Sequence, residues 1–149
     1  GYDPNWFESV KPFDYTSLGI SKNCMIVTLA GTNTKNKRIS DFIKSSKFLI
    51  TKKEVHYVII GKFTKDKGLE KYKDESPLKN NIHILGLRPD AISLIKGSDI
   101  YVQTSLSEGF GRAISEAMSV GKPIIMTNAG GGVRSETACV STWRRPATP

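Results

Sequence analysis

The sequence predicts a single α/β domain in which helices cover both faces of a parallel sheet. Three observations lead to this prediction: five short apolar runs occur, amphipathic segments alternate with them, and glycine or proline separates many of the segments. Continuous apolar runs are typical of strands buried on both faces, and alternating strands and helices imply right-handed crossovers between parallel strands. A chain of 149 residues is also long enough to bury a substantial core.

We expect the strands at the apolar runs. They occupy residues 24–30, 55–61, 81–86, 99–105 and 123–128. The first run reads "CMIVTLA" and the second "VHYVIIG", and both lack the alternation of a strand with one solvated face. The second and third runs end in glycine, which suits the turn that leaves a strand.

Helices are expected between these strands. They occupy residues 38–50, 66–75, 89–97 and 111–120. In the first of these segments Ile39, Phe42 and Ile43 recur at helical spacing, which indicates one buried face. The third begins with proline and ends with glycine, and Gly121 follows the fourth, as is usual at helix ends.

In a parallel sheet of this kind, ligands bind beyond the carboxyl ends of the strands. The loops that follow the strands are therefore the place to search for a site. They are residues 31–37, 61–67, 86–90, 105–111 and 128–132.

The fourth loop carries the most specific pattern, "SEGFGRAISEAM". Glu108 and Glu116 flank a helix start that contains Gly109, Phe110 and Gly111. The glycines let a ligand approach free backbone N–H groups, to which phosphate or sugar oxygens bind, while the carboxylates accept bonds from hydroxyls. This combination suits a nucleotide sugar. The alternative is a helix cap with an ion pair between Glu116 and the arginine four residues before it, worth roughly 0.3 kcal/mol.

Two other loops complete the candidate rim. Gly31 and Thr32 follow the first strand, and Lys37, just before the next helix, can place a positive charge on a phosphate. The last loop contributes flexible backbone at Gly130 and Gly131. The first loop has neither the GxGxxG pattern of a dinucleotide site nor the GK[ST] of a P-loop. A solvated lysine and a plain turn remain the alternatives.

The composition limits the classes of ligand that the chain can bind but does not identify a function. The net charge of +8 favours polyanionic or phosphorylated ligands, including an anionic membrane surface, although scattered lysines also suit a solvated face. Aromatic residues are not interleaved with the basic clusters as in proteins that bind single-stranded nucleic acid, so specific nucleic-acid binding is not expected. Cys24, Cys139, His56 and His83 lie outside metal-ligand spacings, so structural roles are expected for the histidines and for a buried Cys24.

The stretch "SEGFGRAISEAMSVGKPIIMTNAGG" closely resembles the carboxyl-terminal signature of the group-1 retaining glycosyltransferases. The E-x7-E pair, the intervening "GFG", the "EAM" and the "GKP"-to-"GG" run carry this resemblance, which extends more weakly over residues 1–132. It implies a Rossmann-like domain that forms the donor-binding half of a GT-B enzyme. The donor would be a UDP-, GDP- or ADP-linked sugar, and the site would lie in the cytoplasm or at the cytoplasmic membrane face.

The resemblance also implies individual roles. Glu108, the catalytic residue of the set, would contact sugar hydroxyls and help to stabilise charge during transfer, and Glu116 would hold the ribose. Backbone amides near Phe110 and Gly111 would meet sugar and phosphate groups. Lys37 matches the family's diphosphate-binding lysine.

The sequence departs from the pattern of this family at several points. Thr32 stands where an arginine is expected, and no Asp-x-Asp metal motif occurs, in keeping with a family that uses basic groups instead of a bound metal. The acceptor-binding amino-terminal domain is expected to be missing, and residues 133–149 are expected to be a non-matching, disordered tail without strand–helix pattern, so that the domain is truncated. Two other hypotheses stay open, namely a non-catalytic nucleotide- or polyanion-binding module and an inactive gene fragment.

Overall fold

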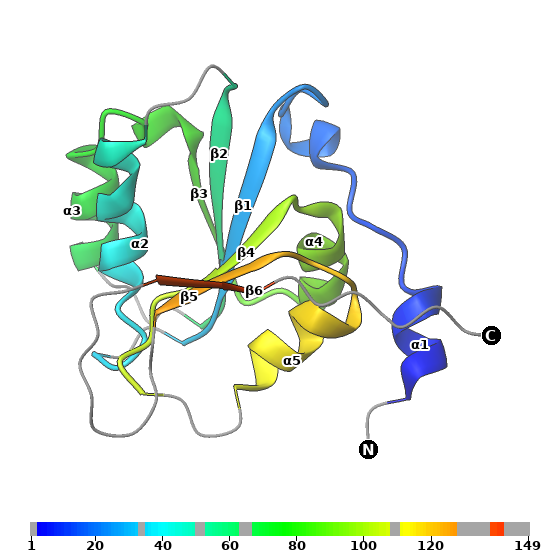
Figure 1. Cartoon of the computed structure of the whole chain (residues 1–149). Coiled ribbons are helices and arrows are strands. Elements are labelled where there is room, and N and C mark those ends of the chain that lie inside the picture. The colour runs from blue at the N-terminus through cyan, green and yellow to red at the C-terminus, as the bar shows by residue number, and fades with distance from the viewer. Residues whose placement is uncertain are drawn as a thin grey trace.

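The computed structural model describes residues 3–32, 35–49, 53–62, 67–107, 111–127 and 138–141 (Figure 1). Six strands form one sheet in the order β3-β2-β1-β4-β5-β6. Their bounds are β1 Met25–Ala30, β2 Val55–Ile60, β3 Ile82–Gly86, β4 Ile100–Gln103, β5 Ile124–Thr127 and β6 Ala138–Ser141. β1 to β5 pair in parallel, so the five predicted strands are confirmed, each slightly shorter than its apolar run.

The predicted helices are confirmed as well. They are α2 Ile39–Ser45, which continues as the 3-10 turn η2 Ser46–Phe48, then α3 Lys67–Asp74, α4 Ala91–Gly97 and α5 Arg112–Ser119. Three short elements were not predicted: α1 Pro4–Ser9, η1 Tyr15–Leu18 and η3 Lys79–Asn81. The capping signals of α1 were nevertheless visible, since Asp3 accepts from the Asn5 amide and Pro4 occupies the first turn.

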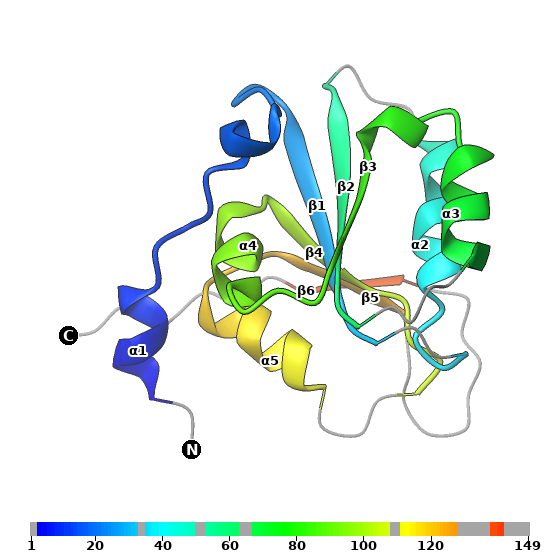
Figure 2. The same cartoon turned by 180° about the vertical axis from the view of Figure 1, so that it is seen from behind.

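The helices lie on both faces of the sheet, as predicted. α2 and α3 cover one face and α4 and α5 the other, as the two opposite views show (Figures 1 and 2). Alternate side chains of the central strands serve the two layers: Leu29 and Tyr57 pack with Phe42 of α2, whereas Ile26 and Val58 belong to the cluster on the other face. All six residues of β2 are buried, which explains its unbroken apolar run.

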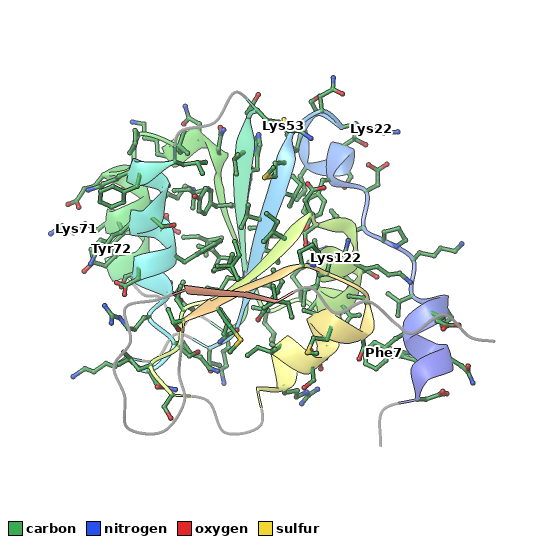
Figure 3. All side chains as sticks on the ribbon, in the orientation of Figure 1. Phe7, Lys22, Lys53, Lys71, Tyr72 and Lys122 are labelled. Carbon is green, nitrogen blue, oxygen red and sulfur yellow. The ribbon has the colours of Figure 1, made fainter. Side chains whose placement is uncertain are left out.

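The amino-terminal helix α1 is attached to the second layer. Phe7, labelled in Figure 3, is 2% exposed. The Lys96 ammonium of α4 donates to the carbonyls of Phe7 and Glu8 at 3.1 and 3.0 Å. A lysine at this place satisfies carbonyl groups that the last turn of a short helix leaves without partners. The segment before the first strand is therefore part of the folded domain.

One sequence expectation fails at the edge of the sheet. Strand β6 pairs antiparallel with β5, with Ala138 opposite Thr127 and Ser141 opposite Ile124. The expectation that residues 133–149 contain no strand is therefore wrong at 138–141, and the other residues of that segment lie outside the described residues. Edge pairing supplies partners for the exposed backbone of β5, which "ACVS" can do without a long apolar run.

Candidate functional site

The candidate site lies where the chain leaves the carboxyl ends of β1 and β4. These strands are parallel neighbours, so the loops that follow them emerge at the same edge of the sheet. The described members of the predicted set are Gly31, Thr32, Lys37, Gly111 and Glu116. The remaining members, Glu108, Gly109, Phe110, Gly130 and Gly131, lie outside the described residues, and their roles stay predictions.

Gly31 and Lys37 come together as predicted. A Cβ placed on Gly31 would lie 3.8 Å from Cδ of Lys37, so the aliphatic stem of the lysine runs across this glycine. The turn after β2 packs against Gly31 more closely still. At Gly61, φ is +148° and a Cβ would overlap the carbonyl oxygen of Gly31. The backbone after β1 is thus packed between a lysine stem and the turn after β2. Thr32 is exposed beside them.

Asn36, which the sequence analysis did not single out, joins the first loop to the fourth. Its Nδ2 donates to the carbonyl of Ser107 at 2.7 Å, and its Oδ1 accepts from the Ser107 amide at 3.0 Å. Its own carbonyl accepts from the Leu106 amide at 2.7 Å. These three bonds hold the residue immediately before Glu108 against the loop that carries Lys37. An asparagine in a polar loop gives no distinctive sequence signal, which is why the residue was missed.

The backbone after Lys37 adopts an unusual conformation. Arg38 has φ +47° and ψ 43°, the left-handed region that a non-glycine residue rarely occupies. Two interactions hold it there: the guanidinium pairs with Asp41 in the first turn of α2, and the Thr104 hydroxyl lies 3.1 Å from the Arg38 carbonyl and 2.8 Å from that of Lys37. The fourth loop therefore contributes to the conformation of the first.

A series of hydrogen bonds from buried polar side chains fixes the direction in which the backbone leaves β4. The Tyr101 hydroxyl lies 2.7 Å from Gln103 Oε1 and 3.2 Å from the carbonyl of Ala30, the last residue of β1. Gln103 Nε2 lies 2.6 Å from Ser105 Oγ, and the Thr127 hydroxyl donates to the Ser105 carbonyl at 2.6 Å. Gln103 and Ser105 are almost fully buried. The ends of β1, β4 and β5 are thus connected through side chains that the apolar pattern did not reveal.

α5 presents the second glutamate of the pair. Gly111 caps the helix at φ +39°, a conformation that favours glycine. Arg112 Nε and Glu116 Oε1 form an ion pair at 3.1 Å, the pair that the alternative interpretation of this motif expects. The two side chains differ sharply in exposure, at 83% for Arg112 and 14% for Glu116. Glu116 is therefore held against the domain, unlike the solvated partner of a surface pair.

A cavity of about 220 Å³ lies at the opposite, amino edge of the sheet. Tyr15, Cys24, Lys53 and Asp99 are among its lining residues, and Figure 3 shows Lys22 and Lys53 at this end of β1 and β2. Burial raises the pKa of Tyr15 to about 12, and its hydroxyl donates to the Leu94 carbonyl at 2.8 Å. This cavity is separated by the length of β1 from the loops of the candidate site.

A sheet in which β3-β2-β1-β4-β5 run parallel, with loops gathered at its carboxyl edge, defines the Rossmann-like α/β class, in which ligands bind at that edge. Comparison with known families narrows this class. The family model described as "Glycosyl transferases group 1" matches residues 11–138, and the chain belongs to this family. The match runs past residue 132, where the resemblance was expected to stop.

Individual relatives agree with the family. The chain is 32% identical to UDP-Gal:alpha-D-GlcNAc-diphosphoundecaprenol alpha-1,3-galactosyltransferase of Escherichia coli, over 76% of this chain and 30% of the relative. It is 28% identical to N,N'-diacetylbacillosaminyl-diphospho-undecaprenol alpha-1,3-N-acetylgalactosaminyltransferase of Campylobacter jejuni, over 89% of this chain and 34% of the relative. The chain thus spans about a third of the length of these curated relatives.

Solved structures show the same fold. The structure of Anabaena HepE in complex with UDP and glucose has a TM-score of 0.76 and 26% identity, over 88% of this chain and 37% of that one. WaaG, a glycosyltransferase involved in lipopolysaccharide biosynthesis, has a TM-score of 0.70 at 20% identity, over 87% and 34% of the two chains, and supports the fold alone. Within the described part of this chain, no helix is long and apolar enough to cross a bilayer.

Proposed function

We propose that the chain is the donor-binding half of a retaining glycosyltransferase that transfers a sugar from a nucleoside diphosphate sugar to an acceptor. The observation that carries the proposal is the connection at the carboxyl edge, where Asn36 holds Ser107 beside the loop of Gly31 and Lys37. This connection supports a site in which the Lys37 side chain lies near the start of the Glu108–Glu116 segment. A diphosphate and a sugar need these two kinds of group side by side.

In this proposal the residues of the rim divide the donor between them. Lys37, with Thr32 next to the same glycine, faces the diphosphate, and the amides of the 109–111 segment donate hydrogen bonds to the phosphate and sugar oxygens. Glu116 holds the ribose hydroxyls, and Glu108 faces the transferred sugar. The glycines of the last loop, Gly130 and Gly131, border the same donor.

UDP is the first nucleotide to test. HepE, at 26–27% identity, has been solved with UDP and with UDP-glucose, and the E. coli relative is named for UDP-Gal. Both curated relatives described above are also named for acceptors on an undecaprenol diphosphate. We therefore propose a lipid-linked glycan as the acceptor, an acceptor domain in the remainder of the enzyme, and a location at the cytoplasmic membrane face, which the net charge of +8 suits.

The test is calorimetric titration of the chain with UDP, GDP and ADP in the presence of a chelator. We expect one of them to bind without added metal, since basic groups and backbone amides are proposed to hold the diphosphate. Glu116→Gln should weaken binding about 10-fold, as expected for loss of a charged hydrogen-bond acceptor. The matched control is Glu75→Gln, an exposed glutamate paired with Lys71 on α3. Absence of binding by all three nucleotides at millimolar concentration would refute the proposal.

A further inference from the structure

Three metal-ligating side chains gather at the amino edge of the sheet, away from the donor site. Cys24 immediately precedes β1, and Glu54 and His56 surround the first residue of β2. The parallel register, which sets Met25 opposite Val55, brings the start of one strand beside the start of the other. One ligand atom from each side chain lies within 4.8 Å of the other two. A thiol, a carboxylate and an imidazole therefore converge on one point.

A second histidine orients the first. His56 Nδ1 lies 2.8 Å from Nε2 of His83 on β3, while His56 Nε2 lies 2.9 Å from Glu54 Oε1. The ring that faces the cluster is thus held through its other nitrogen, which is the usual arrangement of a metal-binding histidine. His83 Nε2 can accept a hydrogen bond from His56 Nδ1 when the proton of the His56 ring lies on Nδ1.

We propose that Cys24, Glu54 and His56 bind a divalent cation of the zinc type, with His83 as the residue that positions His56. Sulfur, nitrogen and oxygen are the three ligand types that Zn²⁺ combines, and three protein ligands leave a fourth position for water. Cys24 and His56 are buried, whereas the Glu54 side chain is 60% exposed and leaves the cluster open to solvent. Hard cations such as Mg²⁺ are disfavoured by the thiol.

The charges and protons balance in the bound state. Binding releases the thiol proton of Cys24 to solvent, and the resulting thiolate together with the Glu54 carboxylate offsets the two positive charges of the ion. With the ion at Nε2, the ring proton of His56 lies on Nδ1 and is donated to His83 Nε2, while the ring proton of His83 lies on its own Nδ1, so the 2.8 Å contact persists. Zn–ligand bonds of about 2.0–2.3 Å require small adjustments of the three ligand atoms, for which the 60% exposed Glu54 side chain has room.

This site lies far from the donor site, so its proposed role is separate from sugar transfer. β1 separates Cys24 from Gly31, and six residues of strand correspond to about 20 Å. A cation here would join the starts of β1 and β2 through side chains, in addition to their backbone hydrogen bonds. The proposed ion thus stabilises the sheet and makes no contact with the donor.

The test uses Co²⁺ as a spectroscopic substitute for Zn²⁺, added to the reduced, metal-free chain. We expect one equivalent to bind and to produce a thiolate-to-cobalt charge-transfer absorption, which excess Zn²⁺ removes. Cys24→Ser should abolish the absorption, whereas Cys139→Ser, the control at the other cysteine, should retain it. His83→Phe should weaken Co²⁺ binding by about 10- to 100-fold.

A second variant is included because Cys24 is buried and its replacement can impair folding, which would also abolish metal binding. Glu54→Gln alters an exposed side chain, so it should fold normally and bind Co²⁺ at least about 10-fold more weakly. Zn²⁺ should also raise the melting temperature of the wild-type chain and raise that of Glu54→Gln less. The proposal is wrong if Co²⁺ gives no charge-transfer absorption, if the absorption survives Cys24→Ser, or if Glu54→Gln binds as tightly as wild type.

Discussion

Replacement of Asn36 by alanine tests whether the first loop positions the segment before Glu108. The substitution removes two side-chain hydrogen bonds to Ser107, of 2.7 and 3.0 Å, and leaves the backbone bond from Leu106 in place. Each such bond contributes about 0.5–1.5 kcal/mol net, and solvent competes at this exposed position, so the expected loss is about 1–2 kcal/mol. If binding requires this loop geometry, the loss corresponds to about 5- to 30-fold in donor affinity.

The assay is calorimetric titration of UDP into the wild-type chain and into three variants. Asn36→Ala should show the full loss, and Asn36→Asp an intermediate one, because the aspartate keeps an acceptor for the Ser107 amide but no longer donates to its carbonyl. Asn23→Ala is the matched control, since this asparagine is exposed and its backbone amide, which the substitution keeps, donates to Ser21 Oγ. An Asn36→Ala chain that binds UDP within twofold of wild type would refute the positioning argument.

Three further predictions concern the rim and the core. Gly61→Ala should lower the free energy of unfolding by more than about 3 kcal/mol in urea denaturation, because its Cβ would overlap a backbone carbonyl oxygen; a near-neutral result would contradict the packing described. Lys37→Ala should weaken UDP binding about 10-fold through loss of a charge-assisted bond, while Lys35→Ala on the same loop should change it little; equal effects would count against the assignment. Tyr15, whose pKa burial raises to about 12 from 10.0, should make stability fall between pH 10 and 12, because the unfolded chain ionises first, and Tyr15→Phe should flatten this fall by about 2 kcal/mol.

The helices and strands of the parallel sheet could be predicted because their signals are local. Apolar runs such as "MIVTLA" and the spacing of Phe42 and Ile43 reflect burial on known faces, and glycines mark where strands end. Strand β6 lacked such a signal. Its four residues gain their conformation from the exposed edge of β5, which a local pattern does not describe.

The candidate site was only partly predictable for the same reason. Glycines and acidic residues in the motif have distinctive chemistry and fixed spacing, so Gly111 and Glu116 could be named from the sequence. Asn36 and Gln103 act through contacts with segments that are brought together by folding, and nothing in their neighbourhood distinguishes them from ordinary polar residues.

The cluster at the amino edge shows the same limit more strongly. Taken singly, Cys24, His56 and His83 have no metal-ligand spacing in the sequence, and each suits a structural role. Strand register places them on one face of the sheet, where nitrogen atoms of the two imidazole rings are 2.8 Å apart and Sγ of Cys24 lies within 4.8 Å of the His56 ring nitrogen. Residues at the starts of β1 and β2 and on β3 can therefore form a site that spacing rules do not detect.

If the nucleotide binds at the carboxyl edge of the sheet, UDP should shift the amide resonances of that edge, which chemical-shift mapping measures. The largest shifts should occur at Gly31, Ser107 and Gly111, with little change at Cys24. Shifts confined to the amino edge, around Cys24 and the cavity beside it, would show that the nucleotide binds elsewhere.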